Sequence, residues 1–471
     1  MIYNSFNFLL IYPILFLLYY VIPAKYPKAR NLYLLIVSYI LYLSWKPVFG
    51  LILFSITVIT YYTALHIDDT KRGKITLRLG ITLSLLPLLF FKYFNFINEN
   101  IYSFLNYCGL DIHFVGLNWA IPIGISFYTF QSVGYVLDVS KKKVEAEHDF
   151  LTYALFLSFF PSITMGPINK ASLVIPQLKK IRTYFDYPKA VEGLKMILWG
   201  MFLKVVIADR LALYINTILP NYSHYNGMSC LMACYLYNIQ IYADFAGYSL
   251  LAIGVGKTLG FELTENFRRP CFAYSVSNFW GRWHISFSTW LKEHIYFTLG
   301  GSRCSKPKIY RNLVLTFMVS GIWHGANWTF IVWGLLHGIF LALERMTNEN
   351  KLHYGTFGMV VKIIITFNLV TLTRVFFQMP TVGDAFNVLG NIFNFHQSMS
   401  IYVNGLQTMF LMIAGIIILF IKDWYDEYRP EKMKIYDNKN IVIRWGAYLT
   451  TIVAIMLFGV FSADQFIYAN F

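Results

Sequence analysis

Charged residues are scarce in this chain. Asp, Glu, Lys and Arg make up 13% of its 471 residues, against roughly 25% in an ordinary soluble domain. Together with an apolar share of 57%, this shortage excludes a disordered protein and a soluble multidomain enzyme. The five cysteines form no C-x-x-C pair, and their odd number argues against a complete disulfide framework. A disulfide scaffold is therefore excluded as well.

Sequence motifs for nucleotide and metal chemistry are also missing. The chain contains no phosphate-binding G-x-x-x-x-G-K-[ST], no glycine-rich dinucleotide fingerprint and no G-x-S-x-G. Its ten histidines are scattered, without the H-x-x-x-H or H-E-x-x-H spacing of metal sites. These absences disfavour a nucleotide-driven pump, and we expect no metal site and no bound cofactor.

What the sequence does contain is a series of long apolar runs. A membrane-spanning helix needs about 20 mainly apolar residues, whereas strands of a membrane β-barrel alternate polar and apolar residues over about ten positions. The runs here are continuous, so the sequence predicts an all-α, polytopic membrane protein that forms one domain over residues 1–471. We expect about eleven spans together with re-entrant or interfacial helices. The candidate runs lie near residues 5–22, 31–46, 48–66, 79–97, 119–139, 150–166, 191–208, 228–253, 313–343, 359–377, 405–421 and 444–461.

The formal net charge is +15, and the basic residues lie mainly in short loops between the apolar runs. Because Lys and Arg collect on the cytoplasmic side of a membrane protein, this distribution indicates topology rather than nucleic-acid binding. We expect an outward-facing N-terminus, contact with membrane lipid, and no nucleic-acid partner. Three loops are predicted to lie in the cytosol: residues 25–30, 71–78 and 141–143.

Two stretches do not have the pattern of simple spans. Residues 266–311 are rich in Trp, Arg, His and Gly, a composition that suits an interfacial helix or the wall of a protein-lined cavity. Residues 313–343 would extend to about 46 Å as one helix, which is too long for an ordinary span. We expect this helix to break at residues 325–327, immediately after His324.

His324 is the strongest candidate for chemistry, because ionisable groups within apolar segments are costly and are functional candidates by default. Gly321 and Gly325 flank it and let backbone or substrate approach closely. An imidazole in a dry, narrow cavity can take a proton from a hydroxyl and pass it on. The alternative is a buried histidine that bonds a neighbouring carbonyl, and the residues alone favour neither.

His284 lies in a segment that we expect to form one helix. On that helix Trp280, Trp283, His284 and Phe287 share a face, which could hold a ligand or orient a proton relay. The alternative, slightly favoured by the residues alone, is that this face packs the helix against its neighbours.

Two other buried candidates carry less weight. Asp244 has no basic neighbour in sequence, so it needs a partner from elsewhere, and structural pairing is its favoured role. His337 follows His324 by thirteen residues, which on one helix places the two on roughly opposite faces. A site shared by these two histidines is therefore not supported.

Two motifs resemble hallmarks of the membrane-bound O-acyltransferase family. One motif consists of residues 278–290 together with residues 299–301, which close it. The other spans residues 321–334. More specifically, the chain is similar to the branch that O-acetylates alginate. The segments that carry this similarity are residues 122–131, 159–161, 166–168, 244–249 and 466–471. The chain departs from that branch at Gly281, at Leu250 and at residues 292–294, where arginine, aspartate and Arg-Asp-Tyr are usual.

The resemblance implies a ring of helices around a central tunnel, in a multi-pass protein of the bacterial cell membrane. It matches His324 to the family's catalytic histidine and His284 to its second histidine. In this branch the donor is acetyl-CoA, and the acetyl group crosses the membrane to an extracytoplasmic partner of SGNH-hydrolase type. That partner modifies a polysaccharide, so we expect O-acetylation of alginate, peptidoglycan or another exopolysaccharide.

The resemblance also implies roles for the neighbouring residues. His324 would act as a general base, which typically contributes about 10²–10⁴-fold to a rate. Its Trp and Asn neighbours would position the thioester and help to hold the oxyanion. The residues expected to contact substrate or line the tunnel are Trp280, Trp283, Trp323, Asn327, Trp328, Asp244 and Arg282.

Two alternative functions stay open. One is D-alanyl transfer to teichoic acid within the same family, which the long region after His337 makes less favoured. The other is a non-enzymatic polysaccharide transporter or flippase, against which the missing internal repeat counts modestly. Under the acetyltransferase hypothesis, the lysines at residues 141–143 could attract the phosphates of the donor, although topology alone also explains them.

Overall fold

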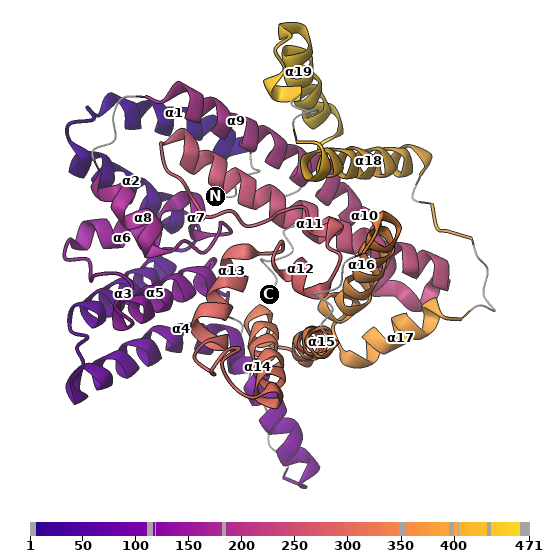
Figure 1. Cartoon of the computed structure of the whole chain (residues 1–471), viewed down its shortest axis with the longest axis horizontal. Coiled ribbons are helices and arrows are strands. Elements are labelled where there is room, and N and C mark those ends of the chain that lie inside the picture. Colours follow the sequence, from indigo (N-terminus) through magenta and orange to yellow (C-terminus); the bar gives the residue numbers. More distant parts are fainter. Residues whose placement is uncertain are drawn as a thin grey trace. The chain divides into compact units, whose positions relative to one another are not determined.

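The computed structural model describes residues 6–110, 116–117, 119–180, 185–347, 354–394, 400–403, 405–430 and 435–461. All regular elements within these residues are helices, so the predicted all-α class is confirmed (Figure 1). The terminal motif at residues 466–471 lies outside the described residues. The described chain forms two compact units, residues 6–193 with 255–264 and residues 194–254 with 265–461. The single domain expected from the sequence stays a prediction.

The first unit is built mainly from the N-terminal helices. A proline begins α2 and another begins α3, at positions where a missing amide hydrogen costs little. The side chains of Thr70 and Asp149 cap α4 and α6 by accepting backbone hydrogen bonds. The helices of this unit are α1 (Phe6–Val21), α2 (Pro27–Leu43), α3 (Pro47–Leu65), α4 (Lys71–Tyr107), α5 (Ile125–Ser140), α6 (Phe150–Ser158), α7 (Phe160–Ile163), α8 (Ala171–Lys179) and the first part of α9 (Tyr187–Met201).

The second unit contains both histidine motifs. Its α-helices are α10 (Asp209–Ile218), most of α11 (Gly227–Thr258), α12 (Val276–Trp280), α13 (Ile285–Leu291), α14 (Lys306–His324), α15 (Trp328–Met346), α16 (Thr356–Gln378), α17 (Val382–Ile392), α18 (Leu406–Tyr428) and α19 (Ile441–Phe458). Shorter turns of 3₁₀- or π-helix lie between them: η1 (Phe202–Ala208), η2 (Leu219–His224), η3 (Pro270–Phe272), η4 (Lys292–Tyr296) and η6 (Ile435–Asp437).

Seven of the described helices are long and apolar enough to cross a membrane, so the chain is a multi-pass membrane protein. They are α3, α4, α11, α15, α16, α18 and α19. One predicted span is wrong as a single helix. Residues 150–166 form α6 and α7 because the backbone leaves the helical conformation at Phe159, and Pro161 lies in the first turn of the new helix. The expected total of about eleven spans and the central tunnel stay predictions.

The segments that follow α3 and α5 meet within the first unit. Lys142, which follows α5, forms an ion pair with Asp69, which follows α3, at 2.6 Å. Tyr61 Oη in the last turns of α3 donates to the carbonyl of His148 at 2.6 Å. The predicted loop at residues 71–78 is wrong as a loop, because Thr70 caps α4 and these residues form its first turns. The cytosolic location of the basic segments stays a prediction.

The break predicted after His324 is confirmed. α14 ends at His324, Gly325 is extended with φ of −163° and ψ of 154°, and α15 begins at Trp328. The Asn327 side chain caps α15 by accepting a hydrogen bond from the Thr329 amide at 3.0 Å. Two helices of ordinary length replace the overlong one.

Glycines let α14 and α15 pack closely as an antiparallel pair. A Cβ atom on Gly334 would lie 2.3 Å from the Phe317 carbonyl oxygen, and one on Gly338 would lie 2.7 Å from Val314 Cα. Any side chain at these positions would push the helices apart, so small residues at the crossing are required. The pairing of residue 334 with 317 and of 338 with 314 shows that the helices run in opposite directions.

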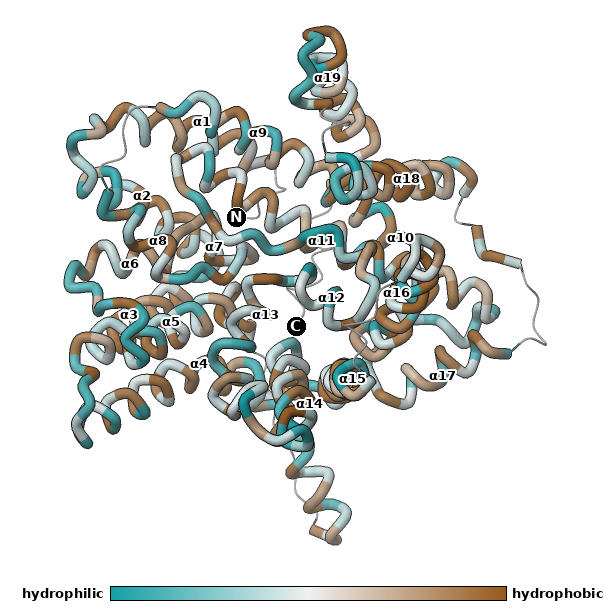
Figure 2. Tube along the Cα trace, viewed as in Figure 1, coloured by the Kyte–Doolittle hydropathy of each residue, from teal (hydrophilic) through white to brown (hydrophobic). Residues whose placement is uncertain are grey.

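α18 and α19 expose much of their apolar surface. Figure 2 shows hydrophobic residues along both helices, and Leu406 is 84% exposed, Val442 74% and Met456 72%. In a bilayer such side chains contact lipid chains rather than water, so this exposure is typical of a lipid-facing surface.

Candidate active site

His324 is buried, with 3% of its surface exposed. The residue that follows has no space for a side chain, because a Cβ atom on Gly325 would lie 2.0 Å from the Phe330 ring. Aromatic rings surround the imidazole at centroid distances of 4.8 Å (Trp323), 5.0 Å (Trp333), 5.1 Å (Phe377) and 5.7 Å (Phe287). These rings exclude water and restrict the orientation of the histidine, as a general base requires.

His284 is fully buried and has a left-handed backbone with φ of 45°, which is rare for a residue with a side chain. Its Nδ1 lies 3.0 Å from Asn266 Oδ1, and that oxygen also accepts hydrogen bonds from the Ser286 amide and hydroxyl. Because a backbone amide can only donate, Asn266 Oδ1 is an acceptor and His284 Nδ1 carries the ring proton. Burial lowers the pKa of His284 to about 3, so the ring stays neutral and its Nε2 is the basic nitrogen.

The structure brings the two histidines into one aromatic cluster. Phe287 stacks on Trp323 with 4.2 Å between ring centroids. Both of these rings contact His284, at 5.0 and 6.0 Å, and both contact His324, at 5.7 and 4.8 Å. The two histidines therefore share a wall, although the catalytic role of each stays a prediction.

The segment that carries His284 is not the single helix predicted from the sequence. α12 ends at Trp280, and α13 begins at Ile285. The left-handed backbone at His284 separates the two helices, and hydrophobic periodicity does not reveal such a backbone. The hydrogen bond from the Ile285 amide to the Asn266 carbonyl, at 2.9 Å, holds the turn in place.

His337 is held by hydrogen bonds on both ring nitrogens. Trp280 Nε1 donates to His337 Nδ1 over 3.3 Å, so His337 Nε2 carries the proton and donates to Thr373 Oγ1 over 3.0 Å. The predicted placement of His324 and His337 on opposite faces of one helix is wrong, because the helix folds back between them. Trp333 lies against both rings, 5.0 Å from His324 and 4.9 Å from His337. With both nitrogens engaged, His337 serves to anchor Trp280.

Trp283 packs against a buried cation that sequence patterns did not single out. The guanidinium of Arg374 lies 4.0 Å from the centroid of the Trp283 ring and donates to the Asn238 carbonyl at 3.2 Å. Arg374 is 4% exposed and lies within the apolar run at residues 359–377. A cation inside such a run is the signal that could have identified it.

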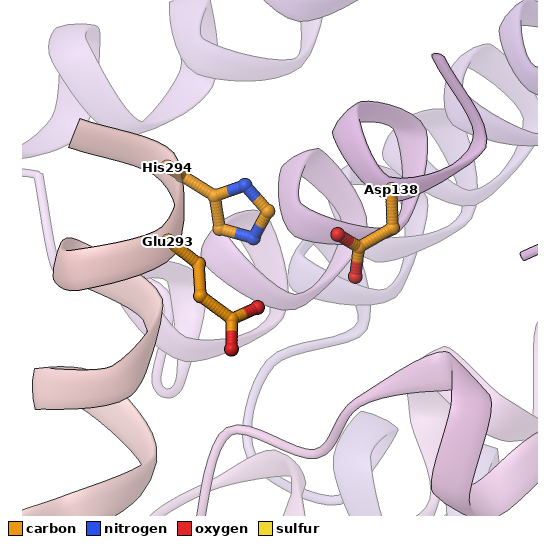
Figure 3. Close-up of side chains that lie close together, drawn as sticks. All are labelled: Asp138, Glu293 and His294. Carbon is orange, nitrogen blue, oxygen red and sulfur yellow. The ribbon is translucent and has the colours of Figure 1, made fainter. Parts of the chain in front are cut away.

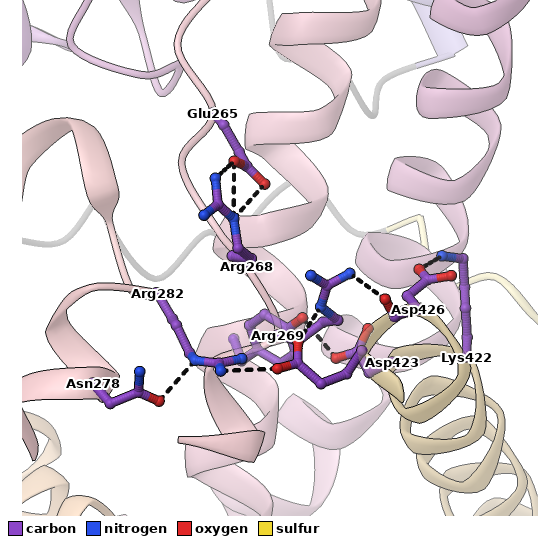
Figure 4. A network of polar contacts seen from close by, with 10 residues as sticks. Glu265, Arg268, Arg269, Asn278, Arg282, Lys422, Asp423 and Asp426 are labelled. Carbon is purple, nitrogen blue, oxygen red and sulfur yellow. Dashed lines mark hydrogen bonds and ion pairs between the residues drawn. The ribbon is translucent and has the colours of Figure 1, made fainter. Parts of the chain in front are cut away.

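Arg282 belongs to a network of ion pairs that joins the segment before His284 to α18 (Figure 4). Arg282 Nη2 and Arg269 Nε each lie 2.8 Å from an oxygen of the Glu427 carboxylate. Arg282 Nε also donates to Asn278 Oδ1 at 2.8 Å. These contacts fix the backbone two residues before His284, so they give Arg282 a structural task. Its contact with substrate stays a prediction.

Asp244 forms a buried ion pair with a lysine. Lys204 Nζ lies 2.7 Å from Asp244 and 2.6 Å from Asp209, and all three side chains are 1% exposed. Buried charges of this kind need partners, and a structural role explains Asp244 without a substrate. Lys204 lies inside the apolar run at residues 191–208, where its charge is a signal that the sequence analysis did not use.

Asn327 and Trp328 lie at the start of α15. Both ends of the Asn327 amide are engaged, since Oδ1 caps the helix and Nδ2 donates to the Pro380 carbonyl at 2.7 Å. These two bonds use Oδ1 and one of the two Nδ2 hydrogens, so they give Asn327 a structural role, and its expected help in holding an oxyanion stays a prediction. Trp328 is 55% exposed, and its tunnel-lining role stays a prediction.

A cavity of about 360 Å³ lies beside the α14–α15 pair in the second unit. Among its lining residues, Lys292 and Arg345 are exposed, whereas Trp280, Leu291 and Phe317 are buried. The exposed cations thus mark the mouth of the cavity and the buried side chains mark its floor. Because α15 ends beside the start of α14, the mouth lies at the basic end of the pair, which includes residues 303–311.

The turn η4 carries the residues at 292–294 that differ from the alginate branch. Figure 3 shows Glu293 and His294 on this turn, and it also shows Asp138 on α5 of the first unit. His294 is 7% exposed, and its ring lies 5.0 Å from that of Trp290, one turn earlier. Within its own unit, Asp138 pairs with Lys143 at 3.6 Å. The expectation of no metal site stays a prediction.

The chain is similar to known proteins over most of its length. The chain is 34% identical to a Pseudomonas putida protein named probable alginate O-acetylase, over 97% of this chain and 95% of that protein. A Pseudomonas aeruginosa protein of the same name is 37% identical, over 90% of this chain and 82% of its own. A peptidoglycan O-acetyltransferase of Helicobacter pylori is 35% identical, over 80% and 76% of the two chains.

Residues 76–379 match the membrane-bound O-acyltransferase family, and this region includes both histidine motifs. The resemblance inferred from those motifs is confirmed. Because the family match, the high coverage of the relatives and the helical membrane fold agree, the chain belongs to the membrane-bound O-acyltransferase family, in the branch that resembles alginate O-acetylases.

Proposed function

We propose that this acyltransferase takes an acetyl group from cytosolic acetyl-CoA and passes it across a bacterial cell membrane for O-acetylation of an extracytoplasmic polysaccharide. A partner of SGNH-hydrolase type would complete the transfer to the polymer. The names of the relatives support acetyl as the group and alginate or peptidoglycan as the class of acceptor. The single observation that carries the proposal is His324, buried among rings at the break between α14 and α15.

His324 acts as the general base of the transfer. An acceptor hydroxyl oxygen attacks the carbonyl carbon of the thioester and gives its proton to the imidazole. The new C–O bond forms as the C–S bond breaks, and the departing thiolate takes the proton from His324 to leave free coenzyme A. The balance of this step needs no metal and no redox partner, and it returns the histidine to its starting state.

Trp333 supplies a hydrogen bond to the carbonyl oxygen during that step. Its ring lies 5.0 Å from the His324 ring, and its Nε1 is buried without a hydrogen-bond partner in the described part of the chain. A buried donor without a partner is costly unless a ligand uses it. A preorganised N–H aimed at the developing negative charge would stabilise the transition state.

The cavity beside α14 is the entry route of the donor. Lys292 and Arg345 at its mouth suit the phosphates of coenzyme A, and the basic end of the α14–α15 pair is the expected cytosolic end. In the first unit, Lys142 and Lys143 already pair with carboxylates, so topology accounts for them. The charged phosphate-bearing end of the coenzyme stays at this mouth, while its thioester end reaches on to His324.

A complementation experiment tests this function. A strain that lacks the gene receives the wild-type chain, His324→Ala or, as a control, Trp445→Ala, which changes an exposed aromatic residue on α19 away from the site. Base-labile acetyl esters are then measured separately on secreted polysaccharide and on peptidoglycan, together with D-alanyl esters on teichoic acid where that polymer is present. We expect acetyl on one polymer to return with the wild type and the control and to stay absent with His324→Ala.

Other outcomes separate the alternatives. Loss and recovery of D-alanyl esters with unchanged acetyl would identify a teichoic acid D-alanyltransferase. Loss of exported polymer, rather than of its acetylation, would identify a transporter or flippase. Full acetylation with His324→Ala would reject His324 as the base.

A further inference from the structure

The cavity that we assign to the donor stops short of His324. On α14 its lining extends to Phe317, which precedes His324 by seven residues, or about 10 Å of helix. The described lining includes Trp280 and Phe317 but neither His324 nor Trp333. An acyl group that travels from the cavity to the histidine must therefore pass the side chains that fill this interval.

Trp280 lies between the cavity and the rings that surround His324. Its ring lies 4.8 Å from that of Phe317, which also lines the cavity, and 5.8 Å from that of Trp333, which does not. Trp333 in turn contacts His324. Trp280 is 6% exposed and lines the cavity, so its indole forms a partition between the cavity and the rings around the histidine.

Hydrogen bonds hold Trp280 in this position. The indole Nε1 donates to His337, His337 donates to Thr373, and Thr373 Oγ1 donates to the Val370 carbonyl at 2.8 Å. His337 and Thr373 are 1% and 3% exposed. Moving the indole would leave buried polar groups without partners, which costs free energy, so the partition resists displacement.

We propose that Trp280 limits the transferred acyl group to the size of acetyl. This inference rests on the proposed function, in which a thioester donor enters through the cavity. A thioester carbonyl near His324 places its acyl chain against the indole, and each methylene that a close-fitting apolar wall excludes changes the rate by about 10–200-fold. Trp280 is thus a specificity-determining residue, with His337 and Thr373 as its positioning residues.

Competition between donors of different length tests the proposal. Membranes that contain the full chain and its partner are supplied with acetyl-CoA, propionyl-CoA or butyryl-CoA, and acyl transfer to the acceptor is measured for each donor. Trp280→Leu shortens the partition, whereas Trp445→Leu makes the same substitution at an exposed position on α19, away from the site. We expect Trp280→Leu to raise the butyryl-to-acetyl ratio by about 10-fold or more, and Trp445→Leu to leave it at the wild-type value.

A variant of the anchor adds a second test. His337→Ala removes the hydrogen-bond partner of the indole but keeps the indole itself. This variant should raise the butyryl-to-acetyl ratio by less than Trp280→Leu does. A purely structural role for Trp280 would instead lower transfer of all three donors in parallel.

The results distinguish failure of the proposed function from failure of the inference about Trp280. If the wild type transfers no acetyl from acetyl-CoA, the proposed function fails, and the partition fails with it. If the wild type is active and Trp280→Leu retains acetyl transfer with an unchanged ratio, the inference about Trp280 alone is overturned. If Trp280→Leu is inactive, donor binding is measured in place of acyl transfer. In the His324→Ala background, Trp280→Leu should then increase stabilisation of the purified protein by butyryl-CoA relative to acetyl-CoA, and an unchanged relative stabilisation overturns the inference.

Discussion

At the scale of single residues, three histidines in one unit have different surroundings and therefore different capacities. His337 uses both ring nitrogens in hydrogen bonds to neighbouring side chains. His284 has its Nδ1 proton fixed by Asn266 and a neutral ring. His324 lies at the end of a helix, next to Gly325 and in contact with the ring of Trp333. The buried indole N–H of Trp333 has no hydrogen-bond partner in the described chain. This is the arrangement that suits proton transfer to and from a substrate.

The Trp333 donor leads to a direct prediction. Trp333→Phe keeps an aromatic ring against His324 and removes only the N–H, so packing changes little. We expect kcat to fall about 10²–10³-fold, as for other oxyanion donors, with KM nearly unchanged because the contact strengthens in the transition state. Steady-state acetyl transfer measures both parameters, with Trp445→Phe on α19 as the exposed control. An unchanged kcat, or a loss confined to KM, would show that Trp333 does not contact the reacting carbonyl.

The buried His284 gives a prediction about pH. Its pKa is about 3 in the folded protein and about 6.5 in an unfolded chain. The unfolded state binds the proton more tightly, so stability is fully present above about pH 6.5 and is lost below it, by up to about 1.4 kcal/mol per pH unit. Unfolding of the detergent-solubilised protein should therefore become easier from about pH 7 to pH 5, and by less in His284→Gln, which does not titrate there. Parallel pH profiles for the two proteins would contradict the buried, neutral ring.

At the scale of elements, the site depends on the close antiparallel packing of α14 and α15. Gly334 and Gly338 face backbone atoms of α14 at distances that leave no space for a side chain. The packing sets the distance between His324 on α14 and Trp333 on α15, and it also positions Phe317 and Trp333, the two rings that Trp280 of α12 contacts. The geometry of the site is therefore determined by the helix pair and not by the two motifs alone.

Gly334→Ala tests this dependence. The new Cβ atom would lie 2.3 Å from the Phe317 carbonyl oxygen, so the helices must separate. We expect a loss of about 1–3 kcal/mol in stability, typical of an overpacked core, together with reduced acetyl transfer. Gly446→Ala in α19 is the matched control, since nothing lies within 4 Å of a Cβ atom there. Thermal unfolding in detergent compares the two, and equal stabilities would show that the helices are not held in close contact.

At the scale of the whole molecule, the sequence predicted the features that local patterns encode. Apolar runs predicted the seven described helices that are long enough to cross a membrane, and excess length before a glycine predicted the break after His324. Features that depend on tertiary contacts were not predicted. The helix break at His284 requires a backbone stabilised by Asn266, and the ion pair of Asp244 comes from Lys204, forty residues away. Periodicity carries no information on such partners.

The same limit applies to the functional residues. The two histidines stand out because their motifs are distinctive, but neither the partition at Trp280 nor its anchor at His337 follows from spacing. Counting thirteen residues along one helix places His337 opposite His324, but the break at residues 325–327 makes that count invalid. The turn between α14 and α15 places Trp333 against both, and only the fold shows this relation.

The central claim is that buried His324 passes acetyl from acetyl-CoA to an acceptor on the other side of the membrane. The most direct measurement uses proteoliposomes that contain the chain and its partner, with radiolabelled acetyl-CoA on the basic side and acceptor polysaccharide on the opposite side. We predict label in the polymer with the wild type and none with His324→Ala, while both proteins insert and fold alike. Label transferred equally by both would contradict the account.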